Sequence, residues 1–358
     1  MRQVEVALGE RSYRICVGPG LLDDAGSLVA SLGTVERIVV VTNAAVRSLY
    51  GAALENSLKE AGLTVEAVIE IADGERFKTL ATVEKVYDGL LDLGGDRSVA
   101  VVALGGGVVG DVAGFAAATA LRGLKLLMVP TTLLAQVDSS VGGKTGVNRP
   151  QGKNLVGVFY QPSLVIADVA TLTSLSEREY RAGLAEVVKY GVILDAPLFE
   201  TLEAESARIE QRDGVLMAEI VARCSALKAS VVERDEKESS GYRAVLNFGH
   251  TVGHGLENLT GYGSYLHGEA VAVGMAAAAR VSASLGECDP GVAGRIEGLL
   301  AVLGLDCRMP TGLDRDELAR AIAFDKKVSG GEVGFVVCTG VGGCRLRKMS
   351  PTDIASAV

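Results

Sequence analysis

Short β-branched runs and helical segments take turns along the first half of the chain, and this alternation constrains the fold more than any other feature. The predicted strands are Arg37–Thr42, Val65–Ile71, Ser98–Leu104, Leu124–Val129 and Ser163–Asp168. The predicted helices are Leu21–Leu32, Ala45–Ala61, Leu80–Leu93 and Val108–Ala120. Continuous apolar strands separated by helices are typical of a parallel sheet covered on both faces. We therefore expect an α/β N-terminal domain with a mostly parallel, Rossmann-like sheet, preceded by a β-hairpin at Val4–Leu8 and Tyr13–Val17.

The pattern changes near Leu175, after which almost every segment has helical periodicity until about Val328. The clearest predicted helices there are Glu177–Val192, Leu198–Ile209, Gly214–Glu233 and Ala270–Leu285. An apolar pair near the end, Gly334–Thr339 and Cys344–Arg347, resembles a small hairpin. A chain of 358 residues is too long for one simple core. We therefore expect two domains, residues 1–174 and 175–358, of which the second is all-α.

The composition limits the kinds of partner that the chain can have. Its net charge of −9 argues against general binding to nucleic acid or to an anionic membrane. Its six cysteines are scattered and form no C-x-x-C pair, which indicates reduced thiols and a cytoplasmic location. The N-terminus has no signal-peptide core, and the richest apolar stretch, Val99–Leu121, is interrupted by Asp111 and by glycines. That stretch is a poor membrane span.

All three histidines of the chain lie in one short segment. His250 and His254 are four residues apart, so they share one face of a helix, and His267 opens the next helical run. Imidazole suits zinc and related divalent metals, whereas the plainer alternative is that these rings cap helices and bond to the backbone. Glu186 is the best candidate for a carboxylate ligand, because it lies with Lys189 on a mostly apolar helix.

A glycine loop and a basic stretch follow two of the predicted strands. The run from Gly105 to Gly110 contains G-x-G-x-x-G and precedes a helix, where backbone N–H groups can approach a pyrophosphate. A simple tight turn is the alternative, because the loop is not on the first strand. Gly142–Thr145 only looks like the end of a Walker A loop, since Asp138 occupies the required first glycine. Lys144 and Lys153 favour an anion pocket near the strand ends.

These motifs together resemble one enzyme family. They are Asp73-Gly74-Glu75-x-x-Lys78, Gly105-Gly106-Gly107-Val108-x-Gly110-Asp111, Arg122-Gly123, Pro130–Asn148, Gly152-Lys153-Asn154, Ala185-Glu186-Val187-x-Lys189, Asn247-x-Gly249-His250-Thr251-x-Gly253-His254, His267-Gly268-Glu269 and Asp325-Lys326-Lys327. In this order they cover essentially the whole chain and look like 3-dehydroquinate synthase. Related sugar-phosphate cyclases share much of the pattern.

The resemblance implies a reaction of the shikimate pathway of aromatic amino acid biosynthesis. In it, 3-deoxy-D-arabino-heptulosonate 7-phosphate becomes 3-dehydroquinate and phosphate, through transient oxidation by NAD⁺, phosphate elimination, reduction and intramolecular aldol closure. The family is a carbon–oxygen lyase that uses NAD and Zn²⁺ (or Co²⁺) and is usually a homodimer. The resemblance also implies NAD binding by residues 1–174, metal and substrate binding by residues 175–358, and an active site in the cleft between the two domains.

The resemblance implies roles for individual residues. The metal ligands would be Glu186, His250 and His267, with His254 lining the substrate pocket instead. The dinucleotide would be held by Asn43, Asp73, Glu75, Lys78, Gly105, Gly106, Gly107, Asp111, Thr131, Thr132, Thr171 and Ser174, with Asp138, Lys144 and Lys153 beside both ligands. The substrate would also meet Arg122, Asn154, Lys189, Lys228, Arg243, Asn247, Lys326 and Lys327, with Arg122 reaching its phosphate from its own or from the partner subunit.

The chain departs from the family pattern at several positions. Ser174-Leu175-Ser176 stands where Thr-Leu-Pro is usual, and Asn43 where some members have Asp.

Three other functions are less consistent with these residues. A metal- and NAD-dependent polyol dehydrogenase would accumulate NADH, and the basic residues disfavour its neutral substrate. A 2-deoxy-scyllo-inosose synthase takes a substrate without a carboxylate, against which Arg243 and Asn247 argue. A binding module would not need metal ligands, a glycine loop and an anion pocket together.

Overall fold

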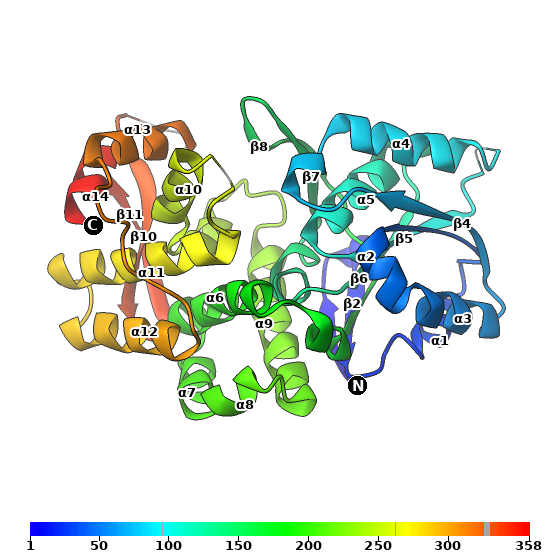
Figure 1. Ribbon diagram of the computed structural model, residues 1–358, viewed down its shortest axis with the longest axis horizontal. Coiled ribbons are helices and arrows are strands. Elements are labelled where there is room, and N and C mark those ends of the chain that lie inside the picture. The colour runs from blue at the N-terminus through cyan, green and yellow to red at the C-terminus, as the bar shows by residue number, and fades with distance from the viewer. Residues whose placement is uncertain (95, 262, 326–329) are drawn as a thin grey trace. The chain divides into compact units, whose positions relative to one another are not determined.

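The computed structural model describes residues 1–94, 96–261, 263–325 and 330–358. The chain divides into two compact units. The first comprises Met1–Leu175 and Gly214–Glu233, and the second comprises Ser176–Asp213 and Arg234–Val358. Figure 1 labels the elements of both units where there is room.

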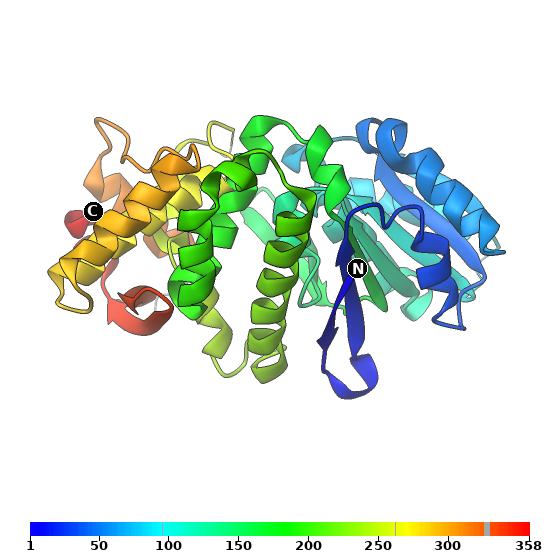
Figure 2. The same ribbon diagram turned by 90° about the horizontal axis from the view of Figure 1, so that it is seen from below.

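The first unit is built on a seven-stranded sheet with the strand order β1-β2-β9-β6-β5-β3-β4. The strands are β1 (Arg2–Val6), β2 (Tyr13–Gly18), β3 (Arg37–Asn43), β4 (Thr64–Ile71), β5 (Val99–Gly105), β6 (Lys125–Pro130) and β9 (Leu164–Asp168). Only β1 runs antiparallel to its neighbour, and the remaining pairs are parallel, as predicted. Figure 2 shows the β1–β2 hairpin at one edge of this sheet. Every residue of β5 and β9 is buried, which explains their unbroken apolar sequences.

The helices of this unit lie between the strands as predicted, with one start displaced. They are α1 (Ala25–Ala30), α2 (Ala44–Val46), α3 (Ala52–Glu60), α4 (Leu80–Leu91) and α5 (Gly107–Thr119). The prediction began α1 at Leu21, but the backbone N–H groups of Gly20 and Leu22 donate to the buried Asp168 carboxylate at 2.8 and 2.9 Å. These bonds hold the preceding residues in turns, so the helix begins only at Ala25.

A second hairpin, β7 (Lys144–Arg149) with β8 (Gly152–Phe159), was not predicted. Gly146 and Gly157 lie opposite each other in this antiparallel pair. A Cβ atom on Gly157 would lie 2.3 Å from the Thr145 carbonyl oxygen, and one on Gly146 would lie 2.7 Å from that of Val156. The close approach of the two backbones therefore requires glycine at these positions. Because glycine is uncommon in strands, the same residues kept the sequence from indicating a hairpin.

Helix α9 (Gly214–Arg234) belongs with the first unit through Glu233, although the prediction placed it in the second domain. Its Glu219 pairs with Arg2 at 3.1 Å, and Glu233 accepts a hydrogen bond from the Ala7 N–H at 2.7 Å. Lys228 Nζ donates to the Asp138 carbonyl at 2.7 Å. Helical periodicity marks α9 as a helix, but it does not say which core the helix packs against.

The second unit is mostly helical. Its helices are α6 (Glu177–Leu194), α7 (Ala196–Ala204), α8 (Ser206–Glu210), α10 (His250–Leu259), α11 (His267–Ser284), α12 (Pro290–Val302), α13 (Arg315–Asp325) and α14 (Pro351–Ala357). The strands β10 (Val333–Gly340) and β11 (Gly343–Met349) pair antiparallel. This confirms the late hairpin and corrects the expectation of an all-α domain, because β10 packs its buried face against α11. Among the described residues, no helix is both long and apolar enough to cross a membrane.

Candidate functional site

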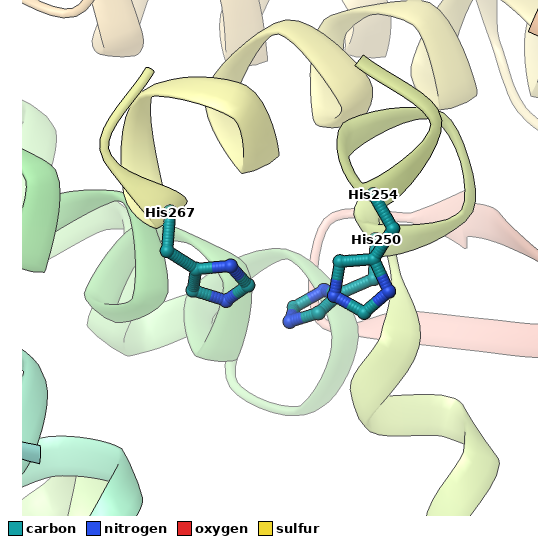
Figure 3. A group of neighbouring side chains, drawn as sticks. All are labelled: His250, His254 and His267. Carbon is teal, nitrogen blue, oxygen red and sulfur yellow. The ribbon is translucent and has the colours of Figure 1, made fainter. Parts of the chain in front are cut away.

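The three imidazoles of the second unit converge on one point. His250 is the first residue of α10, His254 follows one turn later, and His267 is the first residue of α11. Their ring centroids are 5.2 to 5.7 Å apart, and one ring nitrogen from each lies within 4.8 Å of the others. Figure 3 shows the rings turned toward a common space. The clustering expected from the sequence is therefore present in three dimensions.

Glu186 of α6 completes this cluster. Its carboxylate is buried, and its Oε1 lies 3.4 Å from His250 Nε2 and 3.6 Å from His267 Nε2. Two ligands that each lie about 2.1 Å from a tetrahedral zinc ion are about 3.4 Å apart. Lys189 forms an ion pair with Oε2, whereas Oε1 accepts no hydrogen bond from the described residues. A divalent metal would satisfy this buried carboxylate, so the residues fit such an ion.

The second nitrogen of two imidazoles is already engaged. His250 Nδ1 lies 3.2 Å from the carbonyl oxygen of Phe248, and His267 Nδ1 lies 3.2 Å from Oε2 of Glu257. Such partners suit a proton on Nδ1, which leaves the Nε2 lone pair directed toward Glu186. Burial, and then the positive charge of Lys189 and the two other imidazoles, hold the pKa of His250 well below its usual value. His250 is therefore neutral at neutral pH, as metal ligation requires.

Glycines allow the three helices of the cluster to approach closely. A Cβ atom on Gly268 would lie 1.8 Å from the Ala182 carbonyl of α6, and one on Gly274 would lie 1.9 Å from that of Gly249. Arg178 of α6 adds a two-pronged ion pair with Glu269, at 2.6 and 2.7 Å. Contacts between distant segments, rather than local spacing, therefore bring the carboxylate of α6 to the imidazoles of α10 and α11.

The predicted substrate residues of the second unit lie near this cluster along the chain. Lys189 is buried beside Glu186. Arg243 is also buried, donates to the Glu236 carbonyl at 3.1 Å, and lies in the short helix Tyr242–Asn247 that leads to His250. Asn247 ends that helix. Lys326 and Lys327 lie outside the described residues. The substrate roles of all these residues stay predictions.

In the first unit, the predicted nucleotide residues gather where parallel strands end. Asn43 ends β3, Gly105 ends β5, Thr131 follows β6 and Asp73 follows β4. Because these strands are parallel, their carboxyl ends share one edge of the sheet, the usual ligand edge of α/β folds. The Asn43 side chain accepts from the Val46 N–H at 2.8 Å and donates to Asp73 Oδ1 at 3.1 Å.

The glycine loop leads directly into α5. A Cβ atom on Gly105 would lie 2.7 Å from the Val109 side chain, and one on Gly106 would lie 3.0 Å from Thr132 Cγ2. Gly107 begins the helix, and within the described chain no side chain caps its first turn. The open N–H groups of a helix N-terminus suit a pyrophosphate. The loop lies between β5 and α5 as predicted, and its role in nucleotide binding stays a prediction.

A polar network joins four segments beside this loop. Lys78 pairs with Asp111 of α5, where burial raises the pKa of the Asp111 carboxyl against the attraction of Lys78. Asn148 of β7 donates to Glu75 Oε1 at 2.7 Å and accepts from the Asn154 N–H at 2.8 Å. The structure thus unites Glu75, Lys78, Asp111 and Asn154. Sequence reasoning assigned no role to Asn148, although it ends the long motif that begins at Pro130.

The remaining candidate site residues of the first unit lie outside this network and make contacts of their own. Lys228 Nζ, predicted to meet substrate, lies 2.8 Å from Asp138 Oδ1. Lys144 begins β7, and Lys153 lies in β8. Thr132 Oγ1 accepts from the Ala135 N–H at 3.2 Å. Two further contacts involve the segment after β9. Gln136 Nε2 donates a hydrogen bond to Thr171 Oγ1 at 3.2 Å, and the Ser174 hydroxyl is hydrogen-bonded to the Tyr50 hydroxyl.

Arg122 is exposed and occupies left-handed backbone space with a φ of 66°, directly after Leu121 with a φ of 51°. Such conformations cost about 1–3 kcal/mol for non-glycine residues and are common at functional sites. Nothing in the sequence signalled this strain, because neither residue type favours it.

Comparisons with known proteins agree over nearly the whole chain. Residues 68–182 match the model of the 3-dehydroquinate synthase N-terminal domain, and residues 183–328 match that of its C-terminal domain. A 3-dehydroquinate synthase from Pelobacter propionicus is 52% identical over 96% of this chain and 95% of its own.

Two solved structures share the fold. A 2-deoxy-scyllo-inosose synthase, complexed with carbaglucose-6-phosphate, NAD⁺ and Co²⁺, has a TM-score of 0.86 at 28% identity and covers 99% of this chain and 98% of its own. A 2-epi-5-epi-valiolone synthase from Streptomyces hygroscopicus, with NAD⁺ and Zn²⁺, has a TM-score of 0.87 at 30% identity and covers 98% and 97%. Together with the two domain models and the curated relative, these likenesses show that the chain belongs to the 3-dehydroquinate synthase family.

Proposed function

We propose that this enzyme converts 3-deoxy-D-arabino-heptulosonate 7-phosphate into 3-dehydroquinate and phosphate, as a phosphate-eliminating lyase that depends on NAD and a divalent metal. The observation that carries the metal requirement is the convergence of Glu186 Oε1 with His250 and His267 Nε2 at 3.4 and 3.6 Å. The 52% identity to a curated 3-dehydroquinate synthase supports this substrate over that of a related cyclase.

Glu186, His250 and His267 would hold the metal, and the glycine loop Gly105–Gly107 with the Lys78–Asp111 network would hold the dinucleotide. When bound, the metal would polarise a substrate hydroxyl, and NAD⁺ would accept a hydride and later return it. The buried imidazole of His250 is kept neutral, so its Nε2 lone pair stays available.

The chain's cations would orient the two anionic ends of the substrate. Lys189 and Arg243 are buried beside Glu186 and Glu238, and cationic side chains of this kind form charge-assisted hydrogen bonds with phosphate and carboxylate oxygens. In the first unit, Lys144, Lys153, Asn154, Lys228 and Arg122 are the further candidates, with His254 and Asn247 from the second. Holding one substrate in one pose lets a single set of groups serve successive steps.

The deciding experiment supplies the heptulosonate phosphate, NAD⁺ and Zn²⁺, and records phosphate release, 3-dehydroquinate and NADH together. We expect phosphate and 3-dehydroquinate in equal amounts and no accumulated NADH. Accumulating NADH without phosphate would indicate a dehydrogenase instead. A parallel reaction with glucose 6-phosphate tests the alternative activity of a 2-deoxy-scyllo-inosose synthase. If the enzyme converts glucose 6-phosphate but not the heptulosonate phosphate, the proposal is overturned.

We also propose a homodimer and a cytoplasmic location. Strand β8 exposes Leu155, Val158 and Phe159 by 61%, 37% and 38%, and exposed apolar side chains on an edge strand favour association. The six free cysteines support a reducing compartment. Light scattering should give a dimer mass for the native chain and a monomer mass for Leu155→Asp/Phe159→Asp. The matched control, Leu91→Asp at a 50% exposed position of α4, should stay dimeric.

A further inference from the structure

Glu257 is a buried acid to which the sequence patterns assigned no function. It lies on α10, three residues after His254 and seven after His250, so all three side chains share one face of the helix. Its side chain is 3% exposed, and its Oε2 lies 3.2 Å from Nδ1 of His267. Burying a carboxylate is costly unless it is paired, so this position needs a physical reason.

The imidazole ring of His267 is less restrained by its surroundings than that of His250. The side chain of His267 is 31% exposed, whereas that of His250 is 11% exposed and lies against the Phe248 carbonyl. The other nearby acid, Glu269, already binds the Leu266 N–H at 2.7 Å and the Arg178 guanidinium. Glu257 therefore lies on the Nδ1 side of the His267 ring, whereas Glu186 lies on its Nε2 side.

We propose that Glu257 is a positioning residue of the metal centre, which fixes the orientation of His267 and strengthens it as a ligand. This inference rests on the proposed function. A carboxylate on the outer nitrogen of a ligating histidine holds the ring's tautomer and raises the basicity of the other nitrogen.

The test measures metal affinity rather than turnover. The full chain is freed of metal with a chelator and titrated with Zn²⁺ against a chromophoric competitor, and then with Co²⁺ while its visible spectrum is recorded. Loss of such a partner weakens metal binding by about 10–100-fold. We expect Glu257→Ala near the upper end of this range and Glu257→Gln near the lower end, because the Gln amide oxygen still accepts from Nδ1–H.

Two controls separate this role from a general loss of structure. Glu203→Gln removes a surface acid of α7 that pairs with Arg295 at 2.6 Å, and it should keep native Zn²⁺ affinity and the native Co²⁺ spectrum. NAD⁺ affinity should be unchanged in all variants, since the proposed nucleotide residues lie in the other unit.

Native Zn²⁺ affinity and a native Co²⁺ spectrum in Glu257→Ala would overturn the inference while leaving the ligand assignment intact. If that variant fails to fold, Glu257→Gln decides in the same way. A native chain that binds no Zn²⁺ would instead overturn the proposed metal centre, and this inference with it.

Discussion

Oε1 of Glu186 lies 3.4 Å from Nε2 of His250, so a carboxylate from α6 and an imidazole from α10 meet at one buried point. Lys189, one helical turn after Glu186, is buried beside the same carboxylate. The cluster thus brings together a carboxylate, imidazole rings and the amino group of Lys189. The stability of each buried charged side chain there depends on the charged side chain beside it.

Removing the carboxylate should separate metal binding from stability. Glu186→Ala is expected to abolish stoichiometric zinc and to destabilise the fold by about 3–5 kcal/mol, because a buried ammonium loses its counter-charge. Glu186→Ala/Lys189→Met should recover much of the stability but none of the zinc. Elemental analysis and urea unfolding measure the two quantities. Retained zinc in the single variant would contradict the assignment.

Gly268→Ala should loosen the contact between α6 and α11. The added Cβ would lie 1.8 Å from the Ala182 carbonyl oxygen, so the helices must move apart. Overpacking of this kind costs about 1–3 kcal/mol. Displacement of His267 should also weaken Zn²⁺ binding. Urea unfolding and zinc titration measure both effects. The matched control is Gly294→Ala in α12, where no atom lies within 4 Å of the new Cβ, and its stability should not fall.

Gly106→Val should weaken NAD⁺ binding. Even a Cβ atom at this position would lie 3.0 Å from Thr132 Cγ2, and a larger side chain would occupy the space before the α5 N-terminus. We expect the Kd for NAD⁺ to rise at least about tenfold, which corresponds to about 1.4 kcal/mol. Calorimetric titration provides the measurement. Gly110→Ala, with an ordinary 3.5 Å contact to Met128, serves as the control; an equal loss of affinity in both variants would argue against a role for the loop.

Asp235 should make stability depend on pH in the acid range. Hydrogen bonds from the backbone N–H groups of Ser240 and Arg243 lower the pKa of its carboxyl from 3.8 to about 2, although burial opposes this. Since the unfolded chain binds the proton more readily, the carboxylate stabilises the fold above about pH 4, and this contribution is lost as the pH falls toward about 2. Asp235→Asn should be less stable than the native chain at neutral pH, with a difference that shrinks on acidification. Urea unfolding of both proteins across this range tests the trend; a constant difference would contradict it.

Much of the fold was predictable because its signals are local. Buried β-branched runs such as β5 and β9 have no solvent-facing side, so their sequence alone marks parallel strands. The β7–β8 hairpin escaped prediction because Gly146 and Gly157 serve a backbone contact between strands. Helix α9 was recognised as a helix but assigned to the wrong unit, since periodicity reports a buried face and not its partner.

The sequence by itself determined the family, the order of the strands and helices of the parallel sheet, and the gathering of three histidines, because motifs and periodicities are properties of neighbouring residues. The resemblance named Glu186, His250 and His267 as a set, but only the tertiary structure gives the distances between them and shows that Glu257 contacts Nδ1 of the His267 ring. Those contacts depend on how closely α6, α10 and α11 pack, which Gly268 and Gly274 allow by leaving room for a neighbouring carbonyl. Such distances between remote segments leave no periodic trace in the chain.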